Sequence, residues 1–196
     1  MENKSTFFAR LEPVLPPSSI RFIKTAYIFS KFGHRAQSRK EIDDAGNTIR
    51  YFEHPRRVAL ICIDEAKFFS PEAIQACLLH DTLEDTEDMD ADIIEHTFGP
   101  KVCSYVLGLT KRKDVPYIEQ LKNSSEEVVF IKMFDRLDNL RSLDNVGCSQ
   151  EFKQKQLKET SEKYFDIFRN AIVSSNKTIK PNLINILNKI KKIIDE

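Results

Sequence analysis

The chain lacks an excess of charge of either sign, since Lys plus Arg and Asp plus Glu each number 30 among its 196 residues. Proteins that bind nucleic acid normally carry a basic excess, so this balance argues against a nucleic-acid partner. The sequence also lacks the apolar N-terminal run of a signal peptide and any apolar stretch long enough to span a bilayer. We therefore expect neither a secretion signal nor a membrane segment.

Paired cysteines are absent as well, because Cys62, Cys77, Cys103 and Cys148 form no Cys-x-x-Cys motif. The first three lie among apolar residues, where a free thiol packs as a small hydrophobic group. This pattern predicts reduced thiols and a cytoplasmic protein.

No internal repeat, low-complexity tract or convincing strand pattern is present. Apolar residues recur instead at the three- and four-residue spacing of helices. The 41% apolar content suffices for a buried core. We expect an all-α fold, a helical bundle forming one domain over residues 1–196. Its motifs would cover about 20–145, and C-terminal helices would follow over about 150–194.

Local signals place the helix ends. The expected N-caps are Ser18 or Ser19, Ser70, Asp90, and Ser124 with Glu127 as a capping box. After a short helix and a Pro-rich linker in residues 1–18, the expected helices cover about 20–32, 55–65, 71–80, 91–98, 100–109, 124–140, 150–173 and 181–194. Residues 41–50 are expected to form a polar loop with a turn at Gly46-Asn47, and residues 110–123 a loop with a short helix.

The densest set of ionisable groups follows the apolar helix that ends near residue 80. His80 and Asp81 are adjacent, and Glu84 and Asp85 follow one turn later. If the turn stays helical, His80/Glu84 and Asp81/Asp85 are i,i+4 pairs. Four such groups after a buried segment would repel and desolvate one another unless a cation lay among them. Structural ion-pair networks also gather such groups, so a metal site requires further ligands.

Two segments elsewhere can supply these ligands. His54 precedes a helix, and Asp135 lies in a predicted helix with Lys132 and Asn139. A buried helix face has little reason to carry these three polar residues unless they line a pocket. The resulting ligand set mixes nitrogen and oxygen donors, which favours Mn²⁺ or Fe²⁺ over a closed structural zinc site: His54, His80, Asp81 and Asp135.

Four blocks contain these residues in a fixed order: GHRAQSRK at 33–40, YFEHP at 51–55, LLHDTLEDT at 78–86 and KMFDRLDNLR at 132–141. They resemble the HD superfamily, and most closely the hydrolase domain of RelA/SpoT-type enzymes and the stand-alone small alarmone hydrolases. That domain typically reads AHxGQxRK, YxxHP, LLHDxxEDT and KxADRLxNxR. A bare His-Asp pair is weakly specific, whereas four ordered blocks are strongly specific.

The resemblance implies an activity and a role for each matched residue. The activity is removal of pyrophosphate from the 3′ position of guanosine tetra- or pentaphosphate, giving GDP or GTP. The implied Mn²⁺ ligands are His54, His80, Asp81 and Asp135, and the implied catalytic pair on the attacking water is Glu84 and Asp85. The implied substrate-binding residues are Arg39 and Lys40 at the purine end, Tyr51 and Asn139 near the nucleoside, and Lys132 in the same pocket.

The chain departs from the family pattern at three points. Ala36 stands where Gly is usual, Phe134 replaces a small residue, and the segment between Lys40 and Tyr51 is longer than typical. No second region is long enough for the synthetase domain of the bifunctional enzymes. We expect His34 to be a structural residue at a helix end, His96 to lie on the surface, and Arg141 to pair with an acid such as Asp138.

Two other functions remain open from the sequence. One is a phosphomonoesterase of the same fold that acts on another 2′- or 3′-phosphorylated nucleotide such as NADPH. The other is a regulatory module that binds a nucleotide without turnover, against which the intact Glu84-Asp85 pair argues. The basic run at residues 111–113 is either a solvated surface or a contact for substrate phosphates. The oligomeric state stays open.

Overall fold

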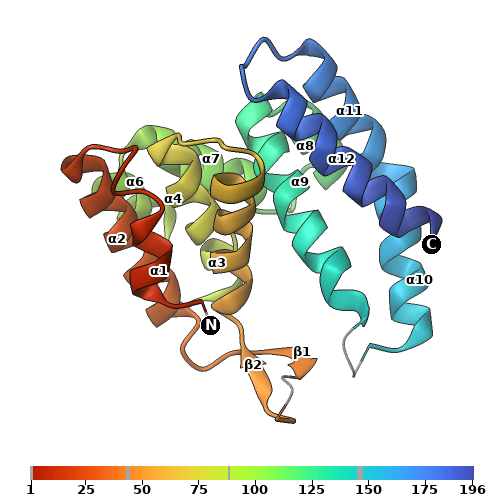
Figure 1. Ribbon diagram of the computed structural model, residues 1–196, viewed down its shortest axis with the longest axis horizontal. Helices are drawn as coiled ribbons and strands as arrows, with labels where there is room; N and C mark the ends of the chain where they lie inside the picture. The colour runs from red at the N-terminus through yellow and green to blue at the C-terminus, as the bar shows by residue number, and fades with distance from the viewer. Residues whose placement is uncertain (1, 43–44, 88, 145–147) are drawn as a thin grey trace.

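The computed structural model describes residues 2–42, 45–87, 89–144 and 148–196. The described part of the chain is mainly helical, as predicted, with one small hairpin (Figure 1). In chain order the helices are α1 (Lys4–Ala9), α2 (Pro17–Gly33), α3 (Glu53–Leu60), α4 (Pro71–Leu79), α5 (Thr82–Asp85), α6 (Ala91–Phe98), α7 (Pro100–Leu109), α8 (Tyr117–Lys122), α9 (Glu126–Arg141), α10 (Gln150–Glu159), α11 (Phe165–Ser174) and α12 (Lys180–Asp195).

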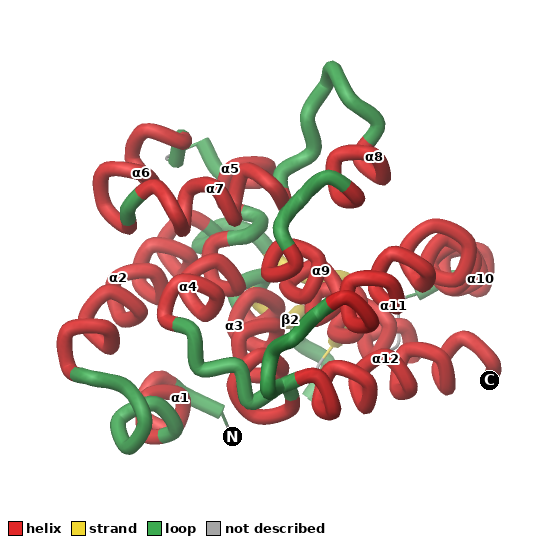
Figure 2. The backbone as a smooth tube through the Cα atoms, turned by 90° about the horizontal axis from the view of Figure 1, so that it is seen from above, coloured by secondary structure: helices red, strands yellow, loops and turns green. Residues whose placement is uncertain are grey.

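Helix α9 occupies the middle of the molecule. It packs against α3, α4 and α7 on one side and against α11 and α12 on the other (Figures 1 and 2). Its side chains are buried on nearly every face, and Phe130, Ile131 and Phe134 are fully enclosed. The unusual Phe134 is thus a core residue. A helix surrounded in this way can carry charged groups only where other polar groups meet them, which singles out Asp135 and Asp138 for inspection.

Several predicted helix ends are confirmed. The Ser70 side chain accepts a hydrogen bond from the Ala73 amide, and Asp90 caps α6 in the same way through Ile93. Helix α6 ends at Gly99, whose φ of +88° lies in the region that favours glycine. The predicted 55–65 helix is α3 continued by a π-helical turn at Ile61–Glu65.

Other predicted boundaries are wrong by a residue or more. The N-cap of α9 is Ser125, one residue after Ser124, and its hydroxyl accepts from the Val128 amide. Helix α2 begins at Pro17, so Ser18 and Ser19 lie inside its first turn. The helix predicted over residues 150–173 is divided into α10 and α11 by a π-helical turn at Thr160–Tyr164.

The expected polar loop at 41–50 is in fact part of an antiparallel hairpin of β1 (Ser38–Ile42) and β2 (Thr48–Arg50). The prediction failed because these strands are short and mostly charged, so they show no apolar alternation. The turn at Gly46 was predicted correctly, and this residue has a φ of +83°. Asp43 and Asp44 of the predicted loop lie outside the described residues. In Figure 1 the hairpin projects from the end of the molecule beneath α3.

Within the described ranges, no helix has the length and apolar character needed to cross a membrane. The four cysteines are free, and Cys62, Cys77 and Cys103 are buried as predicted.

Candidate metal centre and substrate cavity

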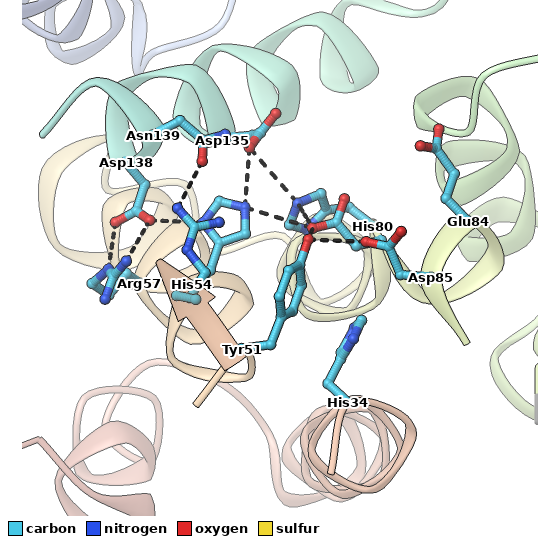
Figure 3. Close-up of polar contacts among 12 residues, drawn as sticks. His34, Tyr51, His54, Arg57, His80, Glu84, Asp85, Asp135, Asp138 and Asn139 are labelled. Atoms are coloured by element: carbon cyan, nitrogen blue, oxygen red, sulfur yellow. Dashed lines mark hydrogen bonds and ion pairs between the residues drawn. The ribbon is translucent and has the colours of Figure 1, made fainter. Parts of the chain in front are cut away.

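Three packed helices bring the predicted metal ligands together. His54 lies in the first turn of α3, His80 ends α4, and Asp81 directly follows it. Asp135 lies in the middle of α9. Because α3 contacts both α4 and α9, side chains from segments 81 residues apart in the sequence meet in one place (Figure 3).

The donor atoms converge within a few ångströms. The Nε2 atoms of His54 and His80 lie 3.6 Å and 3.0 Å from Asp81 Oδ2. Ligand atoms of these three residues all lie within 4.8 Å of one another, as in a site that could hold a metal ion. Asp135 Oδ1 lies 3.1 Å from His54 Nε2 and 3.9 Å from His80 Nε2. The structure therefore brings all four predicted ligands together.

Both imidazole rings are oriented by a partner on their far side. His80 Nδ1 lies 2.8 Å from the carbonyl oxygen of Cys77, and His54 Nδ1 lies 2.7 Å from Asp138 Oδ2. Each partner can only accept, so each Nδ1 carries a proton and Nε2 is left to bind a cation. His80 Nε2 is also a buried atom without a hydrogen-bond partner among the described residues. These donors fit a divalent cation.

Asp135 is held by two neighbours on its own helix. Its Oδ2 lies 2.7 Å from the Lys132 ammonium, and its Oδ1 accepts a hydrogen bond of 2.6 Å from Asn139 Nδ2. Only 5% of the Asp135 side chain is exposed. Lys132 thus contacts a predicted metal ligand directly, and it also lies over the Tyr117 ring.

The charged groups of the site shift one another's pKa values. Burial opposes ionisation of Asp135, but Lys132, His54 and His80 outweigh it and hold the pKa of this carboxyl well below its usual range. Burial likewise lowers the pKa of His80, yet Asp81 and Asp135 raise it overall to about 9. The same carboxylates that stabilise a charged imidazole would attract a metal cation into this position.

Glu84 and Asp85, the two acidic residues that follow His80 and Asp81, make contacts in different places. The Tyr51 hydroxyl lies 2.8 Å from Asp81 Oδ2 and 2.9 Å from Asp85 Oδ2, so its one proton serves two carboxylates and Asp85 borders the metal ligands. The Glu84 carboxylate instead accepts hydrogen bonds from the amide and the ammonium of Lys111. In Figure 3 Glu84 accordingly points away from the histidines.

Four of the five predicted substrate residues line a cavity of about 400 Å³ beside the predicted metal ligands, whereas Lys132 contacts Asp135 and does not line it. Arg39 and Lys40 from β1 border it, as do Tyr51 and Asn139. Arg39 Nη2 donates a hydrogen bond of 2.9 Å to Asn139 Oδ1 although 100 residues separate them. Helix α10 supplies a further wall through Phe152, over whose ring the Lys40 ammonium lies at 5.0 Å. Helix α10 therefore completes this cavity.

Sequence reasoning missed three charged residues behind the site. Asp138, Arg57 and Glu41 form a connected set of ion pairs next to His54. Helical spacing could have indicated two of them, since Asp138 follows Asp135 by three residues and Arg57 follows His54 by three. Nothing in the sequence links Glu41 to either.

Three residues that were predicted to lie outside the site are His34, His96 and Arg141. His34 caps the C-terminal end of α2, binds Gln37 through Nδ1 and stacks on Tyr51, while His96 is exposed, both as expected. Arg141 pairs with Glu65, so the suggested partner Asp138 was wrong.

Comparison with known proteins is consistent with this geometry. The profile described as "HD domain" matches residues 32–171. The human protein named guanosine-3′,5′-bis(diphosphate) 3′-pyrophosphohydrolase MESH1 is 38% identical over 130 residues, which cover 63% of this chain and 69% of that protein. A protein of the same activity name from Aquifex aeolicus is 36% identical over 159 residues. The match covers 76% of this chain but only 21% of the Aquifex protein, so the chain spans about a fifth of that relative.

A solved structure agrees as well. The structure of a metazoan orthologue of SpoT that hydrolyses ppGpp superposes with a TM-score of 0.70 and 28% identity, covering 90% of this chain and 97% of that one. The chain belongs to the HD domain family. Its predicted homology to the hydrolase domains of RelA/SpoT-type and stand-alone enzymes is thereby confirmed.

Proposed function

We propose that this protein is a Mn²⁺-dependent guanosine-3′,5′-bis(diphosphate) 3′-pyrophosphohydrolase. The observation that carries the proposal is the junction made by Asn139, which contacts Asp135 at the metal centre and Arg39 in the adjacent cavity. A nucleotide with its base in the cavity would thereby extend its 3′ phosphates toward the metal ligands. The activity names of the relatives support the same substrate.

His54, His80, Asp81 and Asp135 would hold the ion. When bound, a divalent cation offsets phosphate charge and lowers the pKa of water. In the proposed reaction, water oxygen bonds to the phosphorus on the 3′ oxygen, the bond from that phosphorus to the 3′ oxygen breaks, and the ribose recovers a hydroxyl. GDP or GTP and pyrophosphate result.

We assign Glu84 and Asp85 to the attacking water. Asp85 is the better placed in this structure, since Tyr51 joins it to the ligand Asp81. Tyr51 would keep the two carboxylates together and orient Asp85. Glu84 lies one residue earlier, and its bond to Lys111 ties the basic segment 111–113 to the side of the site where phosphates would lie.

Arg39 and Lys40 would bind the purine end of the substrate. Arg39 lies 5.7 Å from the centre of the Tyr51 ring and Lys40 lies over Phe152, so the cavity mixes cations with aromatic faces. Such surfaces suit a base that must be stacked and hydrogen-bonded. Lys132 would act through Asp135, by keeping that carboxylate ionised and oriented.

The chain would work as one domain in the cytoplasm, without a nucleic-acid partner. A single cluster of buried apolar residues extends from Phe7 in α1 to Ile190 in α12, which supports a single domain. The four free cysteines support a reducing compartment.

One experiment separates this proposal from its alternatives. Purified protein is incubated with Mn²⁺ and a panel of guanosine tetraphosphate, guanosine pentaphosphate and NADPH, and products are identified by anion exchange. We expect pyrophosphate with GDP or GTP, and none after treatment with EDTA. Orthophosphate from NADPH with intact guanosine tetraphosphate would favour a phosphomonoesterase. Bound nucleotide without any product would favour a regulatory module.

A further inference from the structure

A buried carboxylate lies directly behind one of the proposed metal ligands. Asp138 follows Asp135 by one turn on α9 and is 3% exposed. Its Oδ2 lies 2.7 Å from His54 Nδ1, on the side of the ring opposite the other ligands (Figure 3). Because a carboxylate only accepts, this contact selects the form of His54 that is protonated at Nδ1 and leaves Nε2 facing Asp81 and Asp135.

Asp138 accepts two hydrogen bonds from Arg57. Arg57 Nε donates to Asp138 Oδ1 at 2.7 Å, and Arg57 Nη2 donates to Asp138 Oδ2 at 3.1 Å. The two parallel bonds fix the plane of the carboxylate, which a single contact could not do. Arg57 and His54 both lie on α3, so the carboxylate is held between two groups of one rigid element.

The contacts continue from Arg57 to the substrate cavity. Glu41 Oε1 accepts from Arg57 Nη2 at 2.8 Å and from Arg39 Nε at 2.9 Å, and Glu41 is 4% exposed. Arg39 donates to Asn139, which donates to Asp135, whose Oδ1 faces His54. The result is a closed ring of contacts: His54, Asp138, Arg57, Glu41, Arg39, Asn139 and Asp135.

We propose that Asp138 and Arg57 are positioning residues of the metal centre, which hold His54 in its ligand orientation and link it through Glu41 to the substrate-binding Arg39. This inference rests on the proposed function in taking His54 as a metal ligand. Partners behind a ligating histidine orient the ring and raise its basicity, and their loss typically weakens metal binding about 10–100-fold.

A buried ion pair with a purely structural role would also destabilise the fold when broken, so stability does not distinguish the two roles. Metal affinity distinguishes the two roles. The test therefore measures binding of Mn²⁺ alone, without nucleotide, to chelator-treated protein by isothermal titration calorimetry, with electron paramagnetic resonance of free Mn²⁺ as a second readout. Circular dichroism verifies that each variant is folded at the temperature used.

We expect Asp138→Asn to weaken Mn²⁺ binding about 10–100-fold, because the amide loses the charge and turns an N–H donor toward Arg57 or His54. Arg57→Gln should weaken it less, and it provides the readout if Asp138→Asn does not fold. Glu41→Gln should leave Mn²⁺ affinity within about twofold while raising KM for the nucleotide, since Glu41 pairs with Arg57 and Arg39 and not with His54 or Asp138. The control is Glu127→Gln, which removes a carboxylate from the first turn of the same helix α9, where Glu127 is 20% exposed and pairs with Lys177 of the segment between α11 and α12.

Mn²⁺ affinity of folded Asp138→Asn within twofold of the wild type would overturn the proposal, as would an equal loss in Glu127→Gln. If the wild-type protein binds no Mn²⁺, the proposal also fails. A wild-type protein that binds Mn²⁺ but does not release pyrophosphate refutes the proposed substrate alone, because the positioning roles are measured without nucleotide.

Discussion

Replacing Asp135 by Asn changes a charge at the centre of the site while keeping the shape of the side chain. We expect the variant to lose both bound Mn²⁺ and activity, since Asp135 supplies the one ligand from α9. The same change leaves the Lys132 ammonium, which is only 14% exposed, without the carboxylate that lies 2.7 Å away. Two effects are therefore superimposed, and a second substitution is needed to separate them.

The magnitude of the second effect follows from burial. Breaking a buried ion pair by removing one partner costs about 3–5 kcal/mol, because the remaining charge is uncompensated. For a domain of this size about 1 kcal/mol lowers Tm by roughly 2–4 °C, so Asp135→Asn should melt about 6–20 °C below the metal-free wild type. Adding Lys132→Met removes the orphaned charge and retains an apolar contact with Tyr117, which should restore most of that Tm.

The assay is a thermal melt of chelator-treated protein together with Mn²⁺ titration of the wild type and the single and double variants. The expected pattern is recovery of Tm in the double variant without recovery of Mn²⁺ binding. Full Mn²⁺ occupancy in Asp135→Asn would refute the ligand assignment. A double variant that melts as low as the single one would refute the account of Lys132.

Three further outcomes are expected. Glu84→Gln should keep Mn²⁺ and lower turnover about 10²–10⁴-fold if Glu84 turns from Lys111 to act as the general base, and near-normal turnover would leave that role to Asp85. Arg39→Ala should raise KM for guanosine tetraphosphate more than it lowers kcat; unchanged kinetics would disfavour this substrate. Burial opposes ionisation of Glu65, but Arg141 and Lys189 lower the pKa of its carboxyl overall. The Glu65 carboxylate therefore stabilises the fold above the ordinary glutamate pKa, and this stabilisation is lost as pH falls through the lowered pKa. Glu65→Gln should thus reduce the free energy of unfolding by about 1 kcal/mol at neutral pH and by nearly nothing in acid, whereas a pH-independent loss in denaturant titrations would contradict the pairing.

Short-range patterns in the sequence were enough to predict most of the helices and the His80-Asp81 pair of the proposed metal site. Caps such as Ser70 and Asp90 act within three residues, so their effect is readable locally. His80 and Asp81 are adjacent, and the ordered blocks supplied His54 and Asp135 through resemblance. The family motif implied that the four residues belong to one site, and the packing of α3, α4 and α9 gave their relative positions.

Tertiary packing alone decided which charged groups meet. The hairpin forms although its strands lack apolar alternation, and it is through β1 that Arg39 reaches Asn139. Glu84 follows the motif, yet its carboxylate turns to Lys111 because α5 lies against the segment after α7.

The closed ring of contacts that includes His54, Asp138, Arg57 and Glu41 was likewise not predictable from the sequence. Asp138 and Arg57 are each recognisable on their own helices as neighbours of a proposed ligand, but helical periodicity does not say that the two helices face each other or that Glu41 pairs with Arg57. The sequence by itself determined most of the helices, because their signals act within a few residues, and it proposed the ligands because the motif blocks are recognisable by resemblance. The tertiary structure decided their supports, since an ion pair between residues more than 80 apart exists only once α3 and α9 have packed.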